Sequence, residues 1–314
     1  MFNRYRCLNP FVRTARLLVI WVAVCAVSAW AQEPRVPYVP TPQDVVDKML
    51  QMARVSGIDY LIDLGSGDGR IVVTAAKKHG ARGFGVDINP TRVSEATENA
   101  MKAGVADKVA FYQRDLFKTD LTQATVISMY LLPRVNLELR PKLLELKPGT
   151  RIVSHDFAMD DWKPDAHVSM ESREKYSGVG GESEIYFWVV PAKVAGAWRW
   201  ELISGGKGSK AQAYAVTLQQ TFQVVSGSVT VNGRTTPLQN VKLSGDELSF
   251  AFTADLGAGP VKHEFNGKAD GDRLNGSGTL SGSRTRGRYD WNAERAATAA
   301  AVTTALVAQS GKAQ

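Results

Sequence analysis

Cysteine is almost missing from this sequence, which contains only Cys7 and Cys25 among its 314 residues. Both lie in the first 31 residues, so the rest of the chain has no disulfide framework, thiolate nucleophile or cysteine-based metal site. The four histidines are scattered without the spacing of metal ligands, and we predict no metal centre. A chain without cysteine is compatible with an oxidising compartment.

Acidic residues are missing from residues 1–31, which carry four arginines. The arginines are followed by an uninterrupted apolar run over residues 17–27 and then by Ala29-Trp30-Ala31. This is the layout of a secretory signal peptide with a small-residue cleavage site. We therefore predict that residues 1–31 direct export and that the protein is periplasmic. The alternative is an uncleaved membrane anchor, although the run is shorter than the roughly 20 residues that span a bilayer.

A strong net charge is missing as well once this segment is set aside. The chain has a formal charge of +7, and the four arginines of residues 1–31 account for four of these charges, which leaves +3. Residues 32–197 carry 21 Lys and Arg against 22 Asp and Glu. Charge that is so evenly balanced gives no reason to expect a nucleic-acid partner.

Residues 32–191 alternate between strand and helix patterns. A proline-rich stretch, residues 32–42, is expected to be extended, with Thr41 capping a helix whose first residue is Pro42. The strands that follow are near-continuous apolar runs, which predicts a parallel sheet covered on both faces. We expect strands at 60–64, 83–87, 109–113, 124–130, 151–154, 169–171 and 184–190, and helices at 69–78, 90–103 and 134–146. The predicted fold class is therefore α/β, with a Rossmann-like seven-stranded sheet.

Residues 198–295 alternate with period two, and Gly, Asn and Asp mark the turns. This pattern predicts an antiparallel all-β domain, closed as a barrel or packed as a sandwich. We expect eight strands, at 198–202, 213–224, 227–231, 238–243, 248–253, 261–266, 274–280 and 287–291. Residues 296–314 are alanine-rich, and we expect this low-complexity tail to be frayed.

The strongest motif runs from Asp63 to Arg70 and reads Asp-Leu-Gly-Ser-Gly-Asp-Gly-Arg between a predicted strand and a predicted helix. Its three glycines allow a sharp turn and a close approach of the backbone to a ligand at the carboxyl end of the sheet. A dinucleotide fingerprint requires a glycine where Arg70 stands, and a phosphate-binding loop requires a Gly-Lys-Ser/Thr sequence that this chain lacks. Both phosphate-binding alternatives are therefore disfavoured.

Two carboxylates follow the next two strands. Asp87 ends the second strand, where a carboxylate can accept hydrogen bonds from both hydroxyls of a ribose. Asp115 follows the third strand, within reach of the amine of an adenine. In order and in phase with the strands, these features resemble class I S-adenosylmethionine (SAM)-dependent methyltransferases. The resemblance implies SAM as the cofactor, bound by Asp63, Gly65, Ser66, Gly67, Asp68, Gly69, Asp87, Ile88, Asp115 and Leu116.

A narrower resemblance covers most of residues 36–162. Residues 36–40, 63–71 and 87–90 are similar to the small protein-lysine methyltransferases that modify the c-subunit of ATP synthase and the adenine nucleotide carrier, and to their bacterial relatives. The chain departs from the eukaryotic pattern at Tyr130-Leu131-Leu132-Pro133, in its export signal and in the all-β domain. The resemblance implies a protein, or a small molecule, as the methyl acceptor.

Candidates for the acceptor side come from the ends of the fourth and fifth strands. Tyr130 can orient an acceptor nitrogen, or it can pack beneath the next helix. His155 and Asp156 can act as a base or orienting pair, or as ordinary hydrogen-bonded loop residues. These three are the predicted catalytic residues. Weaker candidates are Asn136 and a rim formed by Asp160, Asp161 and Trp162.

Two functions compete at this point. The first is a SAM-dependent methyltransferase, favoured by the glycine-rich turn together with Asp87 and Asp115. The second is an exported, non-enzymatic protein with a vestigial methyltransferase scaffold, whose all-β domain binds an envelope partner. The export signal favours the second, because SAM is made in the cytoplasm.

Overall fold

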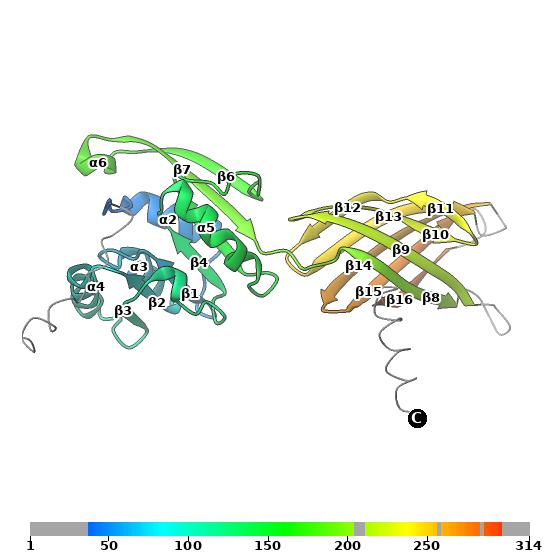
Figure 1. Ribbon diagram of the computed structural model, residues 1–314, viewed down its shortest axis with the longest axis horizontal. Helices are drawn as coiled ribbons and strands as arrows, with labels where there is room; N and C mark the ends of the chain where they lie inside the picture. The colour runs from blue at the N-terminus through cyan, green and yellow to red at the C-terminus, as the bar shows by residue number, and fades with distance from the viewer. Residues whose placement is uncertain (1–36, 204–210, 256–258, 283–285, 297–314) are drawn as a thin grey trace, which may run out of the picture. The chain divides into compact units, whose positions relative to one another are not determined.

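The computed structural model describes residues 37–203, 211–255, 259–282 and 286–296 (Figure 1). The predicted signal peptide and, apart from its first residue, the predicted alanine-rich tail lie outside the described residues. Within the described ranges, no helix combines the length and apolar character needed to cross a bilayer.

The first part of the molecule is a seven-stranded sheet with the order β3-β2-β1-β4-β5-β7-β6. Strands β1 to β5 are parallel to one another, whereas β7 runs antiparallel to both β5 and β6. The order therefore reverses between β1 and β4, which creates a crevice at their carboxyl ends. The strands are β1 (Tyr60–Leu64), β2 (Arg82–Asp87), β3 (Val109–Gln113), β4 (Val126–Met129), β5 (Arg151–His155), β6 (Ala166–Ser172) and β7 (Gly181–Val189).

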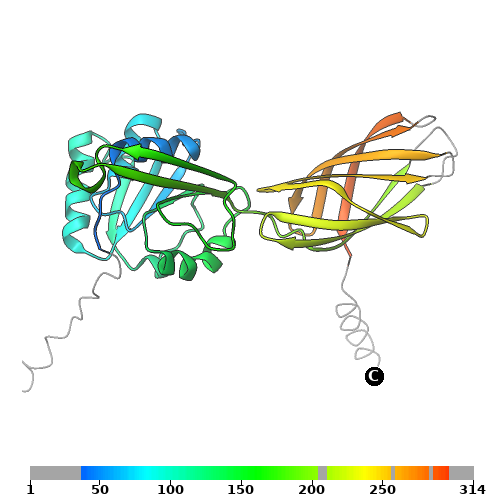
Figure 2. The same cartoon turned by 90° about the horizontal axis from the view of Figure 1, so that it is seen from above.

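Helices cover both faces of this sheet. Three of them, α2 (Gln43–Met52), α3 (Arg70–His79) and α4 (Pro90–Ala103), pack side by side on one face, and α5 (Pro133–Leu144) lies on the other (Figure 2). A short helix, α6 (Lys175–Gly178), occupies the turn between β6 and β7. The predicted α/β class and the seven-stranded Rossmann-like sheet are confirmed.

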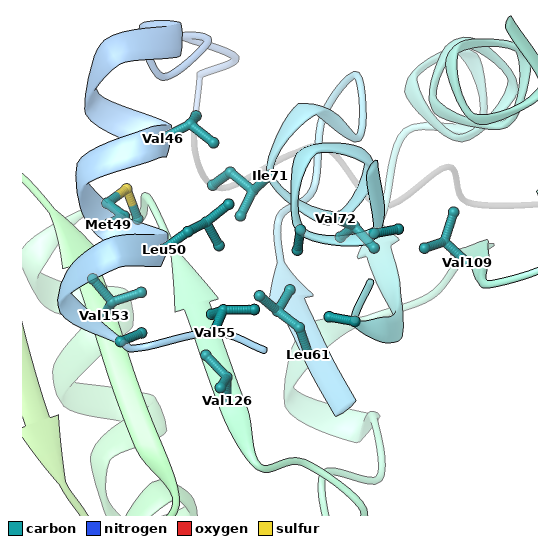
Figure 3. Close-up of a cluster of buried hydrophobic side chains, with 14 of the residues drawn as sticks. Val46, Met49, Leu50, Val55, Leu61, Ile71, Val72, Val109, Val126 and Val153 are labelled. Carbon is teal, nitrogen blue, oxygen red and sulfur yellow. The ribbon is translucent and has the colours of Figure 1, made fainter. Parts of the chain in front are cut away.

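Apolar side chains from α2 and α3 meet the sheet in one continuous core (Figure 3). Met49 and Leu50 of α2 are fully buried there, as are Leu61 of β1 and Val153 of β5. Helix α2 precedes β1 in the sequence but packs beside β5. The residues before α2 therefore cross the carboxyl edge of the sheet. This placement brings residues 38–41 to the crevice.

The start of α2 differs from the prediction. The helix begins at Gln43 with Pro42 at the N-cap position, where the side chain makes no capping bond, and the Gln43 N–H donates to Glu174 Oε2 at 3.1 Å. The hydroxyl of Thr41 lies instead 3.2 Å from Nδ1 of His155, and both residues are buried. A long-range contact has therefore replaced the expected local cap.

The second part is a nine-stranded antiparallel sheet with the order β11-β10-β9-β8-β16-β15-β14-β13-β12. Its two edges approach each other, since β10 lies against β12 and β11 against β13, and the sheet forms a nearly closed barrel. This confirms the predicted antiparallel all-β architecture. The strands are β8 (Gly196–Ile203), β9 (Ala211–Thr221), β10 (Val224–Val231), β11 (Arg234–Pro237), β12 (Gln239–Ser244), β13 (Glu247–Asp255), β14 (Pro260–Asp270), β15 (Arg273–Gly282) and β16 (Arg286–Arg295).

Two features of the barrel were not predicted. The single strand expected over residues 213–224 is divided by a tight turn at Phe222, which has a φ of +53°. No glycine, asparagine or proline marks this turn, so its sequence signal is absent. The short strand β11 was also missed, because Arg234–Pro237 is too short and too polar to show an alternating pattern.

Candidate active site

The glycine-rich turn joins β1 to α3 at the crevice. Gly65, Gly67 and Gly69 have φ values of +77°, +51° and +78°, in the left-handed region that favours glycine. Added Cβ atoms would lie 2.9 Å from the Leu131 side chain, 2.5 Å from the Tyr38 ring and 2.6 Å from the Phe111 ring, respectively. The turn is thus closely surrounded, and any side chain at these positions would displace its neighbours.

The carboxylate of Asp87 is anchored beside this turn by backbone donors. Its Oδ2 accepts a hydrogen bond from Gly67 N at 2.9 Å, and its Oδ1 accepts one from Asn89 N at 2.9 Å. Each oxygen has a second lone pair to offer to a ribose hydroxyl. Ile88, the next residue, is half-buried.

Asp63 lies beneath the turn, fully enclosed, and accepts a hydrogen bond from the Ser128 hydroxyl at 2.7 Å. Burial raises its pKa to about 7, opposed by the Ser128 hydrogen bond and reinforced by the negative charges of Asp68 and Asp87. A positively charged ligand would relieve this repulsion, whereas a phosphate would increase it. The site therefore suits a sulfonium and an ammonium, the two cationic groups of SAM.

Asp68 is less available than predicted. Its carboxylate forms an ion pair with Arg70 at 2.6 Å, and Arg70 also donates to the carbonyl of Thr41 at 2.8 Å. The backbone carbonyl of Asp68 accepts a hydrogen bond from the Asn99 side chain. Asp68 therefore fixes the turn to the segment before α2, and its side chain is already paired with a cation.

Asp115 forms the N-cap of a short 3-10 helix, η1 (Leu116–Lys118). Its Oδ1 accepts a hydrogen bond from Phe117 N at 2.9 Å, which fixes the carboxylate after β3. Leu116 is half-buried next to it. The structure thus places Asp87 and Asp115 after neighbouring parallel strands, on the same edge of the sheet.

The residues present fit SAM in a further respect. The hydroxyl of Ser66, in the middle of the turn, is buried and has no hydrogen-bond partner in the described part of the chain. A buried hydroxyl is normally satisfied, so a polar ligand group at the turn would complete its bonding. SAM supplies a methyl group that is already activated by its positive sulfur.

A second polar cluster lies at the ends of β4 and β5, close to the turn. It contains all three predicted catalytic residues: the Tyr130 ring packs on His155 with centroids 4.0 Å apart, and the Tyr130 hydroxyl donates to Asp156 Oδ2 at 2.9 Å. The side chain of Leu131, beside Tyr130, would lie 2.9 Å from a Cβ added at Gly65. The acceptor-side cluster therefore adjoins the cofactor turn.

The ionisation of this cluster follows from its burial. Burial lowers the pKa of His155 to about 4, so the imidazole is neutral near pH 7. Burial, with the Asp156 carboxylate, raises the pKa of Tyr130, which remains a phenol. Burial alone would raise the pKa of Asp156, but hydrogen bonding to Lys175 and its other neighbours lowers it overall. The result is one carboxylate held between a phenol and an ammonium.

The weaker acceptor-side candidates lie elsewhere. Asn136 is fully buried and donates to the carbonyl of Phe157, a structural bond beneath the cluster. Asp161 pairs with Arg140 at the surface. Trp162 is fully buried against Trp188, with ring centroids 5.9 Å apart, so the prediction that it belongs to an exposed rim is wrong.

Four residues at the site were missed by sequence reasoning. Tyr38 lies against Gly67 with the Arg92 guanidinium 3.8 Å from its ring centroid, and Thr41 contacts His155. Arg70 was noted only because it stands where a dinucleotide-binding fingerprint requires glycine, and no role was predicted for it. Lys175, buried on α6, showed no motif, because only the pairing of β6 with β7 brings it to Asp156.

Comparison with known proteins agrees with this geometry. Residues 63–166 match the model of the ANTKMT methyltransferase domain. A protein-lysine N-methyltransferase from Saccharolobus islandicus is 48% identical over 140 residues, which cover 44% of this chain and 87% of the relative. The mouse adenine nucleotide translocase lysine N-methyltransferase is 38% identical over 136 residues, covering 43% of this chain and 58% of the mouse protein.

A solved structure with high identity is that of an RNA methyltransferase from Salinibacter ruber in complex with S-adenosyl-L-homocysteine. It is 51% identical, covers 50% of this chain and 96% of its own, and superposes with a TM-score of 0.45. The Saccharolobus islandicus protein is matched over 87% of its own length at 48% identity. The chain therefore belongs to the family of SAM-dependent protein-lysine methyltransferases.

Proposed function

We propose that this protein transfers the methyl group of SAM to the side-chain amine of lysine residues in a protein outside the cytoplasm. The observation that carries the proposal is the junction of the two clusters. A Cβ added at Gly65 of the cofactor turn would lie 2.9 Å from the Leu131 side chain, and the adjacent Tyr130 donates a hydrogen bond to Asp156. An acceptor bound at Tyr130 would thus lie next to the cofactor, as displacement at the methyl group requires.

The chemistry asks little of the protein beyond placement and exclusion of water. The amine lone pair forms the new N–C bond, the electrons of the C–S bond remain on sulfur, and the amine gains the positive charge. Asp87 and Asp115 are positioned to hold the ribose and the adenine. Tyr130 is positioned to orient the amine, and His155 is too weakly basic to hold a proton near neutral pH.

Residues 1–31 carry the proposal that the protein works in the periplasm. Fractionation of host cells, with sequencing of the mature N-terminus, tests it directly. We expect a periplasmic protein that begins at Gln32. A protein that begins at Met1 in the membrane fraction would support the uncleaved anchor instead.

The acceptor is best sought by comparing host strains that carry the normal gene or Asp87→Ala. Mass spectrometry of envelope proteins should reveal methylated lysines in the first strain that disappear in the second. Calorimetry with SAM serves as the control: micromolar binding is expected for the normal protein and none for the variant. If SAM binds but the lysine methylation of envelope proteins is identical in both strains, the proposed acceptor class is wrong.

We also propose that the barrel holds an envelope partner or the acceptor itself. On the barrel, the apolar side chain of Val224 is 69% exposed. A photoreactive residue at position 224 should crosslink to an envelope protein, whereas one at Ile58, 93% exposed on the first part, should not. Equal labelling from both positions would argue against docking through the barrel.

A further inference from the structure

The Asp156 carboxylate has its lone pairs filled by donors from this chain. Oδ1 accepts from Lys175 Nζ at 2.9 Å and from Glu184 N at 3.1 Å. Oδ2 accepts from the Tyr130 hydroxyl at 2.9 Å and lies 2.8 Å from Lys175 Nζ. A carboxylate offers about four lone-pair sites. An incoming ammonium group would therefore find no free acceptor on Asp156.

Lys175 reaches Asp156 from α6, at the turn of the β6–β7 hairpin. It is only 4% exposed, and its ammonium also donates to the carbonyl of Glu182. A buried ammonium is costly unless it is paired, and here Asp156 supplies the counter-charge. The pair is electrically neutral, so the Asp156 carboxylate itself offers no uncompensated negative charge to a second cation.

Tyr130 presents an uncharged acceptor to the site. Its single hydroxyl proton is used in the bond to Asp156, which leaves the oxygen lone pairs for another donor. A neutral phenol oxygen can accept an N–H from an amine but cannot balance the full charge of an ammonium. The Tyr130 hydroxyl and the Lys175 ammonium share one carboxylate, so they lie within two hydrogen-bond lengths of each other.

We propose that Lys175 is a positioning residue that makes this site receive the acceptor lysine as the neutral amine. This inference rests on the proposed function. Lys175 neutralises Asp156, and its positive charge disfavours a second ammonium at Tyr130. The acceptor therefore releases its proton to solvent on binding, donates an N–H to the Tyr130 oxygen and keeps its lone pair for the methyl group. The methylated product, again a cation, is disfavoured by the same charge and leaves.

The other ionisable groups around the cluster do not replace Lys175. His155 is neutral near pH 7, because burial lowers its pKa to about 4. Two of these groups are basic, but Arg173 is exposed on the same hairpin and His167 pairs with Glu184. The remaining charged or titratable neighbours are carboxylates and phenols, which carry no positive charge. They are Asp44 on α2, Glu174 and Tyr176 beside Lys175, and Glu182, Glu184 and Tyr186 on β7.

The inference is tested by the pH dependence of acceptor binding. The probe is a capped single-lysine peptide, titrated into the full chain loaded with S-adenosylhomocysteine, with a norleucine twin as the uncharged control. If only the neutral amine binds, affinity should rise about tenfold per pH unit below the lysine pKa of about 10.4, with about one proton released. The norleucine peptide should show no pH dependence.

Three variants separate the role of Lys175 from simple stability. In Lys175→Met the lysine peptide should bind with little pH dependence, since its ammonium can now occupy Asp156. Its kcat should then rise with pH, whereas that of the normal protein stays flat near neutral pH, because kcat reports ionisations within the bound complex. Lys175→Arg should behave like the normal protein. Arg173→Met removes a charge from an exposed position on the same hairpin and should change nothing.

The outcomes distinguish this inference from the function on which it rests. If the normal protein binds SAM but no lysine peptide at any pH, the proposed acceptor class fails. If it binds the lysine peptide with an affinity independent of pH and no proton release, the acceptor class stands and the role of Lys175 is overturned. A Lys175→Met variant with normal pH dependence would overturn it equally.

Discussion

Two buried histidines, one in each part of the molecule, show how differently the parts are built. His155 and His263 are both fully buried, and burial lowers the pKa of each to about 4. His155 has the Thr41 hydroxyl at 3.2 Å and the Asp156 carboxylate nearby. His263 stacks on Phe252 with ring centroids 4.4 Å apart, and neither of its nitrogens has a partner in the described part of the barrel.

The difference concerns what surrounds a buried polar group. Such a group costs free energy unless it is hydrogen-bonded. Around His155 the neighbours are a phenol, a carboxylate and an ammonium, all paired with one another, and the cluster adjoins the cofactor turn. Around His263 they are aromatic rings, among them Phe252, Phe265 and Tyr214. His155 belongs to the candidate active site, whereas His263 lowers the stability of the core in which it lies.

The largest expected effect is the acid sensitivity of the barrel. The unfolded chain protonates His263 from about pH 6.5 downwards, whereas the folded barrel does so only near pH 4. The unfolded state therefore binds more protons in this window, and stability falls as the pH drops from about 6.5 to about 4. The loss amounts to roughly 3 kcal/mol at 1.36 kcal/mol per pKa unit.

His263→Phe should remove this loss, because the ring keeps its shape and gains no charge. Hydrogen exchange of the backbone amides of β13 and β14, followed against pH, measures the loss of stability within the barrel. Exchange of β5 should keep its own acid dependence, since His155 titrates in the same window and is unchanged. A barrel equally acid-sensitive with and without His263 would contradict this explanation.

The next effect concerns the cofactor turn. Gly67→Ala places a Cβ 2.5 Å from the Tyr38 ring at a φ of +51°. Strain of about 1–2 kcal/mol, together with displacement of the ring, should weaken SAM binding by roughly 100-fold. Calorimetry with SAM measures the change, and the unfolding transition of the barrel should be unaffected. Normal affinity would mean that Tyr38 and the turn do not enclose the cofactor.

A smaller effect is expected at the acceptor side. Tyr130→Phe removes the hydroxyl that bonds Asp156 but keeps the ring on His155. We expect kcat to fall by about 10- to 50-fold through lost orientation of the acceptor, at unchanged SAM affinity. Tyr214→Phe is the control, because it removes a phenol hydroxyl from a tyrosine that lies in the barrel. Equal losses in both variants would indicate a general effect on stability.

The two parts also differ in how much of their structure could be predicted from the sequence. In the first, the turn from Gly65 to Gly69 and the carboxylates Asp87 and Asp115 were placed correctly in relation to the strands. The turn follows β1 directly, Asp87 is the last residue of β2, and Asp115 lies two residues after the end of β3. Their roles toward SAM remain predictions. Lys175 could not be found, since its contact with Asp156 depends on the pairing of β6 with β7.

In the barrel, alternation of polar and apolar residues predicted most strands, and glycine and aspartate marked hairpin turns such as those at Gly245 and Gly271, but the turn at Phe222 was missed. The turn at Phe222 has no local turn signal, so the chain reverses there because the flanking strands pair. Thr41 shows the same limit within the first part, because its hydroxyl turned from the expected helix cap to His155. Local chemistry predicts what a residue can do, and long-range packing decides which partner it takes.

The smallest effect sharpens the comparison of glycines. Gly271, in the hairpin between β14 and β15, has a φ of +57°, close to that of Gly67, but an added Cβ there meets nothing within 4 Å. Gly271→Ala therefore carries only the backbone strain, about 1 kcal/mol, without a clash. Urea unfolding should register that loss in the barrel, while SAM affinity stays normal. If Gly271→Ala and Gly67→Ala weakened SAM binding alike, left-handed backbone strain alone would explain both losses. The contact of the cofactor turn with Tyr38 would then not explain the loss of SAM affinity in Gly67→Ala.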